Sequence, residues 1–307
     1  MAAPTSILLI ANPRSGRAAA GLDAALQIFA EAGIAVELTQ PASPAALDAI
    51  IRQRGGQFGA VVLAGGDGTV NAAAQALAET RRPFGLLPFG TANDLAHTLS
   101  IPIGATAARV IAEGHSQRID LGHVNDRVFV NAASLGLPVS VAQHQDPELK
   151  RRLRALSYVV TVFRAFRACT RRFTVWITTD GQTTRLKTIQ VTVGNGVRFG
   201  GGMRVGTDPR IDDGMLDVFA IDADTVLHLV QAAFAVRFGL HDMSPYTRTF
   251  RGHHVRVETR TPRPVNTDGE ITTETPAVFS VERGALEIYC PPPRPAGWPF
   301  RQPRTPA

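Results

Sequence analysis

The first 100 residues alternate between short, wholly apolar runs and segments that carry apolar side chains at helical spacing. The apolar runs are 6–11, 34–38, 60–64 and 84–88, and the helical segments are 18–32, 44–54, 70–79 and 93–99. A strand that is apolar throughout must be covered on both faces, and strands that alternate with helices form parallel sheets. The pattern therefore predicts an α/β domain built on a doubly wound parallel sheet.

The sequence pattern changes beyond about residue 118, where short β-rich runs are separated by turns containing Gly, Asp, Asn and Pro. These runs are 128–132, 173–179, 188–193, 216–221, 254–259 and 277–282, and the best helical segments among them are 148–168 and 225–238. Such a succession of strands predicts a second domain, an antiparallel β-sandwich. We expect the first domain over residues 1–119 and the second over 120–284, with 285–307 able to return to the first.

Composition limits the chemistry further. The chain has 307 residues and a net charge of +6, and nearly all of its positive charge is arginine, since Lys150 and Lys187 are the only lysines. Neither lysine follows a glycine, so the sequence contains no GxxxxGK[ST] phosphate loop. The basic balance suits an anionic partner. Basic residues are not interleaved with aromatic ones as in nucleic-acid modules, so we expect no nucleic-acid partner.

Loops rich in glycine and small polar residues follow three of the predicted parallel strands. They are Asn12-Pro13-Arg14-Ser15-Gly16 after the first strand, Gly65-Gly66-Asp67-Gly68-Thr69 after the third, and Phe89-Gly90-Thr91-Ala92-Asn93-Asp94 after the fourth. The carboxyl ends of parallel strands meet at one edge of the sheet, where ligands bind. Three such loops at one edge favour a nucleotide site over three unrelated tight turns.

The residue types in these loops suit phosphate groups. Glycines let backbone N–H groups approach a phosphate, and the following helix presents the positive end of its dipole. Arg14 can neutralise phosphate charge. Asp67 is an unsuitable phosphate contact because like charges repel, but it suits a magnesium ion, directly or through water.

The segment Asn266-Thr267-Asp268-Gly269-Glu270 carries two carboxylates separated by a glycine. Repulsion and partial burial would raise the pKa of one of them, as a general base requires. The same sequence is also typical of a hairpin turn. From the residues alone both interpretations stay open.

Taken together and in this order, the motifs Gly65–Thr69, Gly90–Asp94, Ile119–Gly122 and Asp268–Glu270 resemble those of the bacterial diacylglycerol kinase and lipid kinase family. That family also includes the catalytic domains of eukaryotic diacylglycerol and sphingosine kinases. The resemblance spans residues 6–291. It implies a magnesium-dependent enzyme that transfers the γ-phosphoryl group of ATP to a hydroxyl group of a lipid such as diacylglycerol.

The resemblance also implies roles for individual residues. ATP would lie along Asn12, Pro13, Arg14, Ser15, Gly16, Gly66, Asp67, Gly68, Thr69, Val70, Asn71, Ala72 and Thr91, with Thr39 as a further contact. Asp67, Asp94, Asp120 and Asp268 would form the carboxylate network at the catalytic Mg²⁺, and Glu270 would be the general base. A second, structural Mg²⁺ would be bound by the Asp213 side chain and the backbone carbonyls of Arg210 and Met215.

The sequence leaves several alternatives open. An NAD-kinase-like enzyme with a soluble substrate and a nucleotide- or lipid-binding regulator without turnover are the rival functions. The segment 150–172 combines basic and apolar residues, which suits either an anionic membrane surface or a solvated helix face. No apolar run reaches the roughly 18 residues of a membrane-spanning helix. We therefore expect a cytoplasmic protein, with peripheral contact at the inner face of the membrane and a homodimer both left open.

Overall fold

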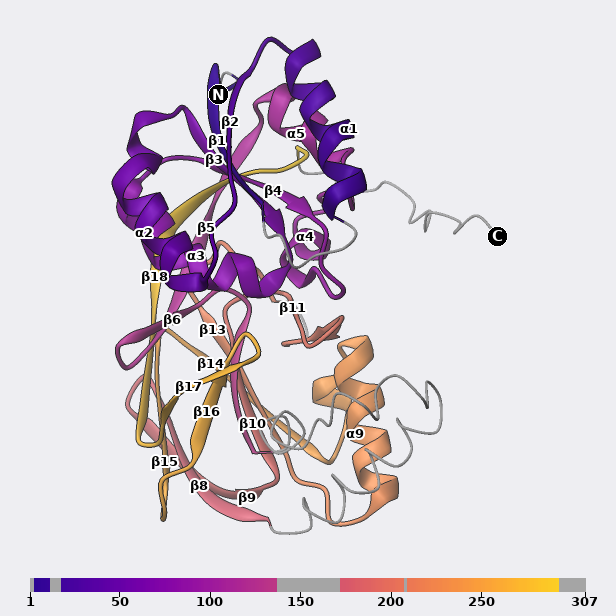
Figure 1. The fold of residues 1–307 in the computed structure, drawn as a ribbon. Helices are drawn as coiled ribbons and strands as arrows, with labels where there is room; N and C mark the ends of the chain where they lie inside the picture. The colour runs from indigo at the N-terminus through magenta and orange to yellow at the C-terminus, as the bar shows by residue number, and fades with distance from the viewer. Residues whose placement is uncertain (1–2, 12–17, 137–171, 207–208, 293–307) are drawn as a thin grey trace.

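The structure is a computed structural model, and it describes residues 3–11, 18–136, 172–206 and 209–292. Figure 1 shows two domains, an α/β domain above and a domain of antiparallel strands below. The predicted fold class is therefore confirmed. The predicted helix over 148–168, the basic segment 150–172 and the loop Asn12–Gly16 lie outside the described residues, apart from Arg172.

Four parallel strands form the core of the first domain. They are β1 (Ser6–Ala11), β2 (Ala35–Thr39), β3 (Ala60–Gly65) and β4 (Phe84–Pro88), in the spatial order β2-β1-β3-β4. The helices α1 (Ala18–Glu31) and α5 (Ala107–Glu113) cover one face of the sheet, and α2 (Pro44–Arg54) and α3 (Asp67–Thr80) cover the other (Figure 1). Strands β1, β3 and β4 are buried along nearly their whole length, whereas the edge strand β2 is half exposed.

The ends of the helices follow from their sequences. Helix α2 begins after Ser43, whose hydroxyl accepts a hydrogen bond from the Ala46 amide at 3.1 Å, and Pro44 occupies its first turn. Serine at this position and proline just inside it are typical of helix starts. Helix α3 begins at Asp67, three residues before the predicted start, because Gly66 remains extended and a carboxylate is favoured in the first turn.

The parallel sheet continues into the second domain through one long strand, β18 (Ala277–Tyr289). Ile288 of β18 lies parallel to Phe84 of β4, while the same strand pairs antiparallel with β5 (Ser116–Val124) and β15 (His254–Thr259). The strands β8 (Phe173–Thr179), β9 (Gln182–Thr188) and β6 (Arg127–Phe129) complete a ten-stranded sheet. The sequence predicted only 277–282 of β18, because an irregular register between Glu282 and Leu286 interrupts the alternation.

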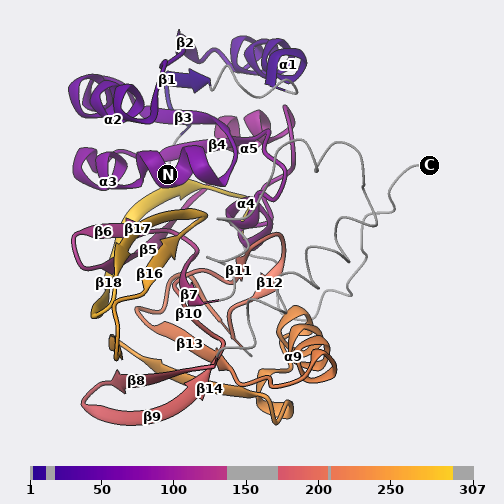
Figure 2. The same ribbon diagram turned by 60° about the horizontal axis from the view of Figure 1, so that its bottom comes forward.

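A second, six-stranded sheet is antiparallel throughout. Its order is β14 (Thr247–Gly252), β13 (Leu216–Ile221), β10 (Gln190–Gly194), β7 (Ala132–Gly136), β16 (Pro264–Thr267) and β17 (Glu270–Glu274). Buried side chains from both sheets, among them Phe129, Phe279 and Val265, form one core cluster. Figure 2 shows β13 and β14 of this sheet beside β8 and β9 of the first sheet. Helix α9 (Val226–Phe238) packs on the outer side with the small pair β11 (Arg198–Phe199) and β12 (Met203–Arg204).

Among the described residues there are also three short helices, namely η1 (Gly55–Gln57), α4 (Asp94–Thr98) and η2 (His241–Met243). In the parts of the chain that the structure describes, no helix has both the length and the apolar character needed to span a membrane.

One predicted strand is wrong in a way that matters for the site. The run 128–132 is not continuous, because β6 ends at Phe129 and β7 begins at Ala132. Between them the chain passes from the first sheet to the second. The amides of Val130, Asn131 and Ala132 all donate to one carboxylate, that of Asp268, instead of to a neighbouring strand.

A buried histidine makes the stability of the second domain dependent on pH. His241 is fully buried beside the ring of Phe219, with ring centroids 5.1 Å apart. Burial lowers the pKa of His241 below its ordinary value of 6.5. As pH falls below about 6.5, the unfolded chain binds a proton at His241 that the folded chain does not yet bind. The free energy of unfolding therefore keeps its full value above pH 6.5 and decreases as pH falls below it.

We expect the free energy of unfolding of the wild type to fall by up to about 1.4 kcal/mol per pH unit from this group below pH 6.5. In His241→Leu this part of the pH dependence should vanish, whereas replacing the exposed His97 by glutamine should preserve it. Urea unfolding at several pH values measures the difference. Equal pH dependence in the wild type and His241→Leu would contradict the prediction.

Candidate functional site

The site is built where β3 and β4 end, and two glycines let the loops after these strands touch. A Cβ atom placed on Gly90 would lie 2.5 Å from the Cα of Gly66, and one on Gly66 would lie 2.8 Å from the Cα of Gly90. Both distances are too short for any side chain. Asn93 fixes the second loop, since its Oδ1 accepts from the Gly90 amide at 3.0 Å and its Nδ2 donates to the Gly90 carbonyl at 2.9 Å.

This contact sets two aspartates at the starts of two helices. Asp67 is the first residue of α3 and Asp94 is the first residue of α4. The Oδ1 atom of Asp67 accepts a hydrogen bond from the Leu95 amide at 3.4 Å. Burial and the neighbouring charge of Asp94 raise the pKa of Asp67, and hydrogen bonds from backbone amides oppose the rise.

Asp268 comes from the second domain and joins this acidic cluster. Its Oδ2 accepts from the Val130 amide at 2.6 Å, and its Oδ1 accepts from the amides of Asn131 and Ala132, both at 3.0 Å. These three hydrogen bonds stabilise the carboxylate, yet burial outweighs them and raises its pKa to about 6, with a further contribution from the charge of Asp67. The repulsion between Asp67 and Asp268 couples one group from each domain.

The two interpretations of the Asp268-Gly269-Glu270 segment are compatible. Asp268 and Gly269 both have positive φ angles, 47° and 107°, and form the two-residue turn between β16 and β17. Asp-Gly is the favoured pair for such a turn. The turn places Asp268 against the β6–β7 connection and makes Glu270 the first residue of β17.

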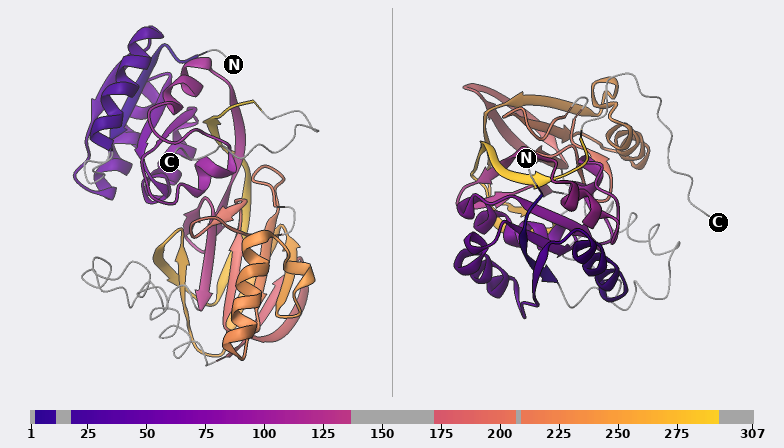
Figure 3. Two further views of the ribbon diagram at one scale, coloured as in Figure 1. Left: turned by 90° about the vertical axis from the view of Figure 1, so that its right-hand side faces the viewer. Right: turned by 90° about the horizontal axis from the view of Figure 1, so that it is seen from above.

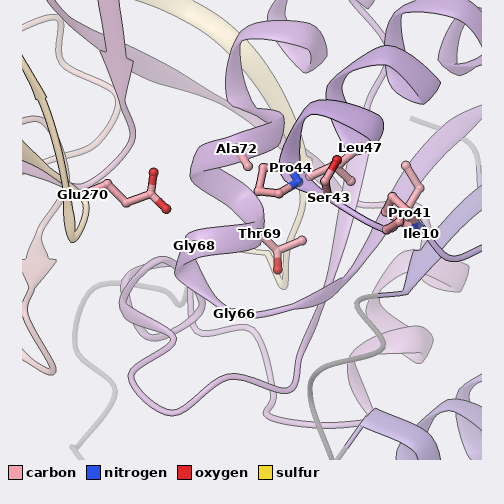
Figure 4. A pocket seen from close by; sticks show the side chains of 11 residues that line it. Ile10, Pro41, Ser43, Pro44, Leu47, Gly66, Gly68, Thr69, Ala72 and Glu270 are labelled. Atoms are coloured by element: carbon pink, nitrogen blue, oxygen red, sulfur yellow. The ribbon is translucent and has the colours of Figure 1, made fainter. Parts of the chain in front are cut away.

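Glu270 faces the loop that follows β3 across an open cavity of about 370 Å³ (Figure 4). The far wall of this cavity includes Gly66, Gly68 and Thr69, and its other residues are Ile10, Pro41, Ala42, Ser43, Pro44, Leu47 and Ala72. A carboxylate on one domain therefore faces the amino end of α3 on the other.

A second cavity, of about 270 Å³, contains the three aspartates. Its lining residues are Asp67, Ala92, Asp94, Asn131, Ala132, Ser134, Phe199, Gly200, Gly201, Met203, Asn266, Asp268 and Gly269. Neighbouring residues face different cavities, since Gly66 and Gly68 line the first while Asp67 lines the second. Likewise Glu270 lines the first cavity and Gly269 the second. The start of α3 and the β16–β17 turn thus separate two adjoining spaces.

Two residues that line the second cavity each have a buried oxygen atom without a hydrogen-bond partner. These oxygens are the Oδ1 atoms of Asp94 and Asn131, on residues that are each 4% exposed. The other oxygen of Asp94, Oδ2, accepts from the Gly201 amide at 3.0 Å. A buried polar atom without a partner is costly, so these oxygens are suited to a ligand that supplies a positive charge or a donor.

The remaining nucleotide residues predicted from the resemblance fall into different positions. Ala72 lines the first cavity, and Thr39 ends β2 next to the 41–44 segment of its wall. Val70 is 1% exposed and belongs to the core, so its side chain is not accessible to a ligand. Thr91 is exposed, and Asn71 has a buried Oδ1 without a hydrogen-bond partner.

Asp120 lies in β5, and both oxygens of its carboxylate accept backbone hydrogen bonds. Oδ2 accepts from the Gly214 amide at 2.6 Å and Oδ1 from the Gly284 amide at 2.7 Å. The side chain thus holds the loop before β13 against the irregular part of β18. It does not line either of the two cavities described above.

The predicted second metal site contains an arginine. The Oδ1 of Asp213 accepts from the Met215 amide at 2.9 Å, and its Oδ2 pairs with Arg251. Arg210 pairs with Asp212 at 3.2 Å. The guanidinium of Arg251 balances the charge of the Asp213 carboxylate in this structure, and the Mg²⁺ site at Arg210, Asp213 and Met215 stays a prediction.

Some residues at the site were not singled out by the sequence analysis. Only Pro44 of the segment Pro41–Pro44 was assigned, to the start of a helix, although all four residues form part of the first cavity wall. The run Gly200-Gly201-Gly202 was missed as well, and all three of its residues have positive φ. Three consecutive glycines before a two-residue strand are the signal that could have revealed this loop.

Comparison with known proteins follows the same division of the chain. Residues 6–124 match the family model of the diacylglycerol kinase catalytic domain, and residues 131–290 match that of the YegS C-terminal NAD kinase β-sandwich-like domain. A Pseudomonas aeruginosa protein named "probable lipid kinase YegS-like" is 32% identical over 243 residues, covering 76% of this chain and 77% of that protein.

Two further relatives agree with these matches. A Staphylococcus carnosus diacylglycerol kinase is 29% identical over 234 residues, covering 75% of this chain and 76% of its own length. The crystal structure of a protein assigned as a diacylglycerol kinase from Bacillus anthracis superposes with a TM-score of 0.81 at 25% identity. That superposition covers 95% of this chain and 97% of the other.

The close approach of the two loops predicts different effects for two glycine substitutions. Gly90→Ala places its methyl group against backbone, so we expect a loss of about 1–3 kcal/mol of stability and weakened nucleotide binding. Gly68→Ala meets nothing within 4 Å, so its free energy of unfolding should be equal to the wild type or slightly higher. Thermal unfolding with and without ATP tests this, and equal melting temperatures for both variants would contradict it.

Proposed function

Because this chain belongs to the family of bacterial diacylglycerol kinases and YegS-like lipid kinases, we propose that it transfers the γ-phosphoryl group of ATP to a hydroxyl group of a lipid. The observation that supports this most directly is the position of Glu270. It faces Gly66, Gly68 and Thr69 across one cavity, while Asp67 and Asp268 line the cavity next to it. Base, phosphate loop and carboxylates therefore meet between the two domains.

The first cavity is the site we assign to the ATP phosphates. Asp67 and Gly68 are the first two residues of α3, and the amides of a first helical turn lack acceptors within their own helix. The helix dipole also favours negative charge at this end. Gly68 leaves its backbone open to the cavity, because no heavy atom lies within 4 Å of the position its Cβ would take.

The acidic cluster is the site we assign to the catalytic Mg²⁺. Among the described residues, no group of three or more His, Cys, Asp or Glu side chains is arranged to hold a metal ion. Mg²⁺ commonly binds through one or two carboxylates together with substrate phosphates and waters. Asp67 and the unpartnered Oδ1 of Asp94 fit that donor set. When bound, Mg²⁺ would neutralise charge on the phosphates.

Glu270 is the group we assign as general base. Its carboxylate would accept the proton of the acceptor hydroxyl as that oxygen bonds to the γ-phosphorus. The bond from the γ-phosphorus to the bridging oxygen breaks in the same step, and its electron pair leaves with ADP. Phosphoryl transfer depends mainly on positioning and charge neutralisation, so the two-domain arrangement carries most of the catalysis.

The second cavity is the site we assign to the head of the acceptor. Its wall combines the three aspartates and Asn131 with the apolar side chains Phe199 and Met203. The unpartnered Oδ1 of Asn131 can accept a hydrogen bond from a hydroxyl group. A molecule with a hydroxyl-bearing head and an apolar remainder matches this lining, which favours a lipid acceptor.

We expect Glu270→Gln to lower phosphoryl transfer by about 10²–10⁴-fold with little change in ATP affinity, because a general base contributes about that factor. Glu274→Gln is the matched control, since Glu274 is an exposed glutamate at the other end of the same strand. Transfer of labelled γ-phosphate from ATP to a panel of lipids in mixed micelles measures the effect, with NAD offered in parallel.

The outcomes of this panel separate the candidate functions. Label in one lipid, lost in Glu270→Gln and retained in Glu274→Gln, is the expected result. Label entering NAD instead would replace the lipid acceptor by a soluble one, in keeping with the NAD-kinase-like description of the second domain. ATP binding without transfer to any acceptor would indicate a regulator without turnover.

Removal of magnesium gives an independent prediction. If the ion binds with the nucleotide, chelation should abolish transfer and weaken ATP binding without lowering the melting temperature of the free protein, because Mg²⁺ held by one or two carboxylates depends on the phosphates for its other ligands. Readdition of Mg²⁺ should restore both. Asp94→Asn should require more Mg²⁺ for half-maximal activity. A fall in the melting temperature of the nucleotide-free protein on chelation would point to a resident structural metal.

A further inference from the structure

Helix α9 carries an apolar stripe on its outer side. The side chains of Leu227, Val230, Phe234 and Phe238 are spaced by three and four residues, so they lie on one face of the helix. They are 63%, 55%, 59% and 56% exposed, respectively. The rings of Phe234 and Phe238 contact each other with centroids 4.5 Å apart.

The opposite face of α9 already supplies its attachment to the domain. Leu229, Ala232 and Val236 are buried in a cluster with Phe219 and Val205. Figure 3 shows α9 lying on the outside of the second domain, with the strands behind it. The exposed stripe is therefore additional to the surface that the fold needs, and four large apolar side chains in a row are uncommon on a water-exposed helix.

The charges of this helix match a negatively charged surface. Residues 226–238 include no Asp or Glu, and the charged side chain among them is the exposed Arg237 next to Phe238. Asp224, which precedes the helix, pairs with His228, and Asp242, which follows it, accepts from the Thr249 hydroxyl at 2.8 Å. A helix face that presents apolar side chains together with a basic one, and no acidic one, suits the interface of an anionic membrane.

A short series of contacts leads from this helix to the second cavity. The Nη1 of Arg237 donates to the Gly202 carbonyl at 3.1 Å. One residue earlier, the Gly201 amide donates to the Oδ2 of Asp94 at 3.0 Å. Gly200 and Gly201 are part of the wall of the cavity that we assign to the acceptor head.

We propose that the apolar stripe of α9 docks on an anionic lipid surface, which brings the second cavity to the membrane where its acceptor resides. The proposal rests on the proposed function for its purpose, but the docking itself requires no catalysis. Apolar side chains enter the acyl boundary while Arg237 remains among the headgroups.

The test is sedimentation with vesicles, which measures binding without catalysis. Wild type, Leu227→Glu and Phe234→Glu are compared with Ile103→Glu, which alters an equally exposed apolar residue in the first domain (Ile103 is 50% exposed). Vesicles of phosphatidylcholine mixed with phosphatidylglycerol should bind the wild type and Ile103→Glu equally. The α9 variants should bind at least about tenfold less tightly, because a charge replaces buried apolar area. Vesicles of phosphatidylcholine alone should bind the wild type more weakly.

Measurements on the unbound proteins distinguish the other ways of covering the stripe. We expect equal melting temperatures and equal molecular masses for all four proteins. A lower melting temperature in Phe234→Glu would show that another part of this chain covers the stripe, and a smaller mass would show that a second copy does. Either result, or equal vesicle binding by all four proteins, would overturn the proposal.

Activity separates this proposal from the proposed function. A short-chain diacylglycerol offered as a monomer in solution should be phosphorylated at the same rate by the wild type and Phe234→Glu. Transfer from vesicles should fall only in the α9 variants. If no protein transfers phosphate to any lipid while the wild type still binds vesicles through α9, the proposed function fails and the docking surface stands.

Discussion

The geometry of the site depends on one half-buried carboxylate, that of Asp268. It accepts three backbone hydrogen bonds from Val130–Ala132, at the place where the chain leaves one sheet for the other. Those amides have no strand partner there, so the side chain satisfies donors that would otherwise be lost. The same carboxylate fixes the β16–β17 turn, and Glu270 follows it by two residues. Glu270 is therefore held facing the loop after β3 by an interaction made outside the cavity that it lines.

This arrangement has an electrostatic cost that points to a ligand. Burial raises the pKa values of Asp268 and Asp67, and the two groups repel each other across the domain boundary. Hydrogen bonds from amides relieve the repulsion only in part. A cation shared with bound phosphates would lower the energy of every carboxylate in the cluster at once. The acidic cluster would therefore be more stable with a cation bound. Because Asp67 and Asp268 belong to different domains, binding of that cation would depend on how closely the two domains approach.

The sequence predicts local structure well and distant contacts poorly. The range of α2 was predicted without error because Ser43, Pro44 and the apolar spacing all lie within the helix or next to it. The break between β6 and β7 could not be predicted, since it depends on Asp268, which is 138 positions away. Asp120 illustrates the same limit at the site. Its motif indicated a magnesium ligand, while its partners Gly214 and Gly284 come from two remote loops. The motifs singled out these carboxylates as candidates, but not the atoms that they would face.

The glycine loop 200–202 contributes to the site through the position of its backbone and not through side-chain chemistry. It offers no functional group except its backbone, yet its Gly201 amide binds Asp94 and its Gly202 carbonyl binds Arg237. All three residues have positive φ, at 57°, 87° and 102°, a conformation that residues other than glycine rarely adopt. The loop therefore connects Asp94 to the exposed helix α9 through two hydrogen bonds.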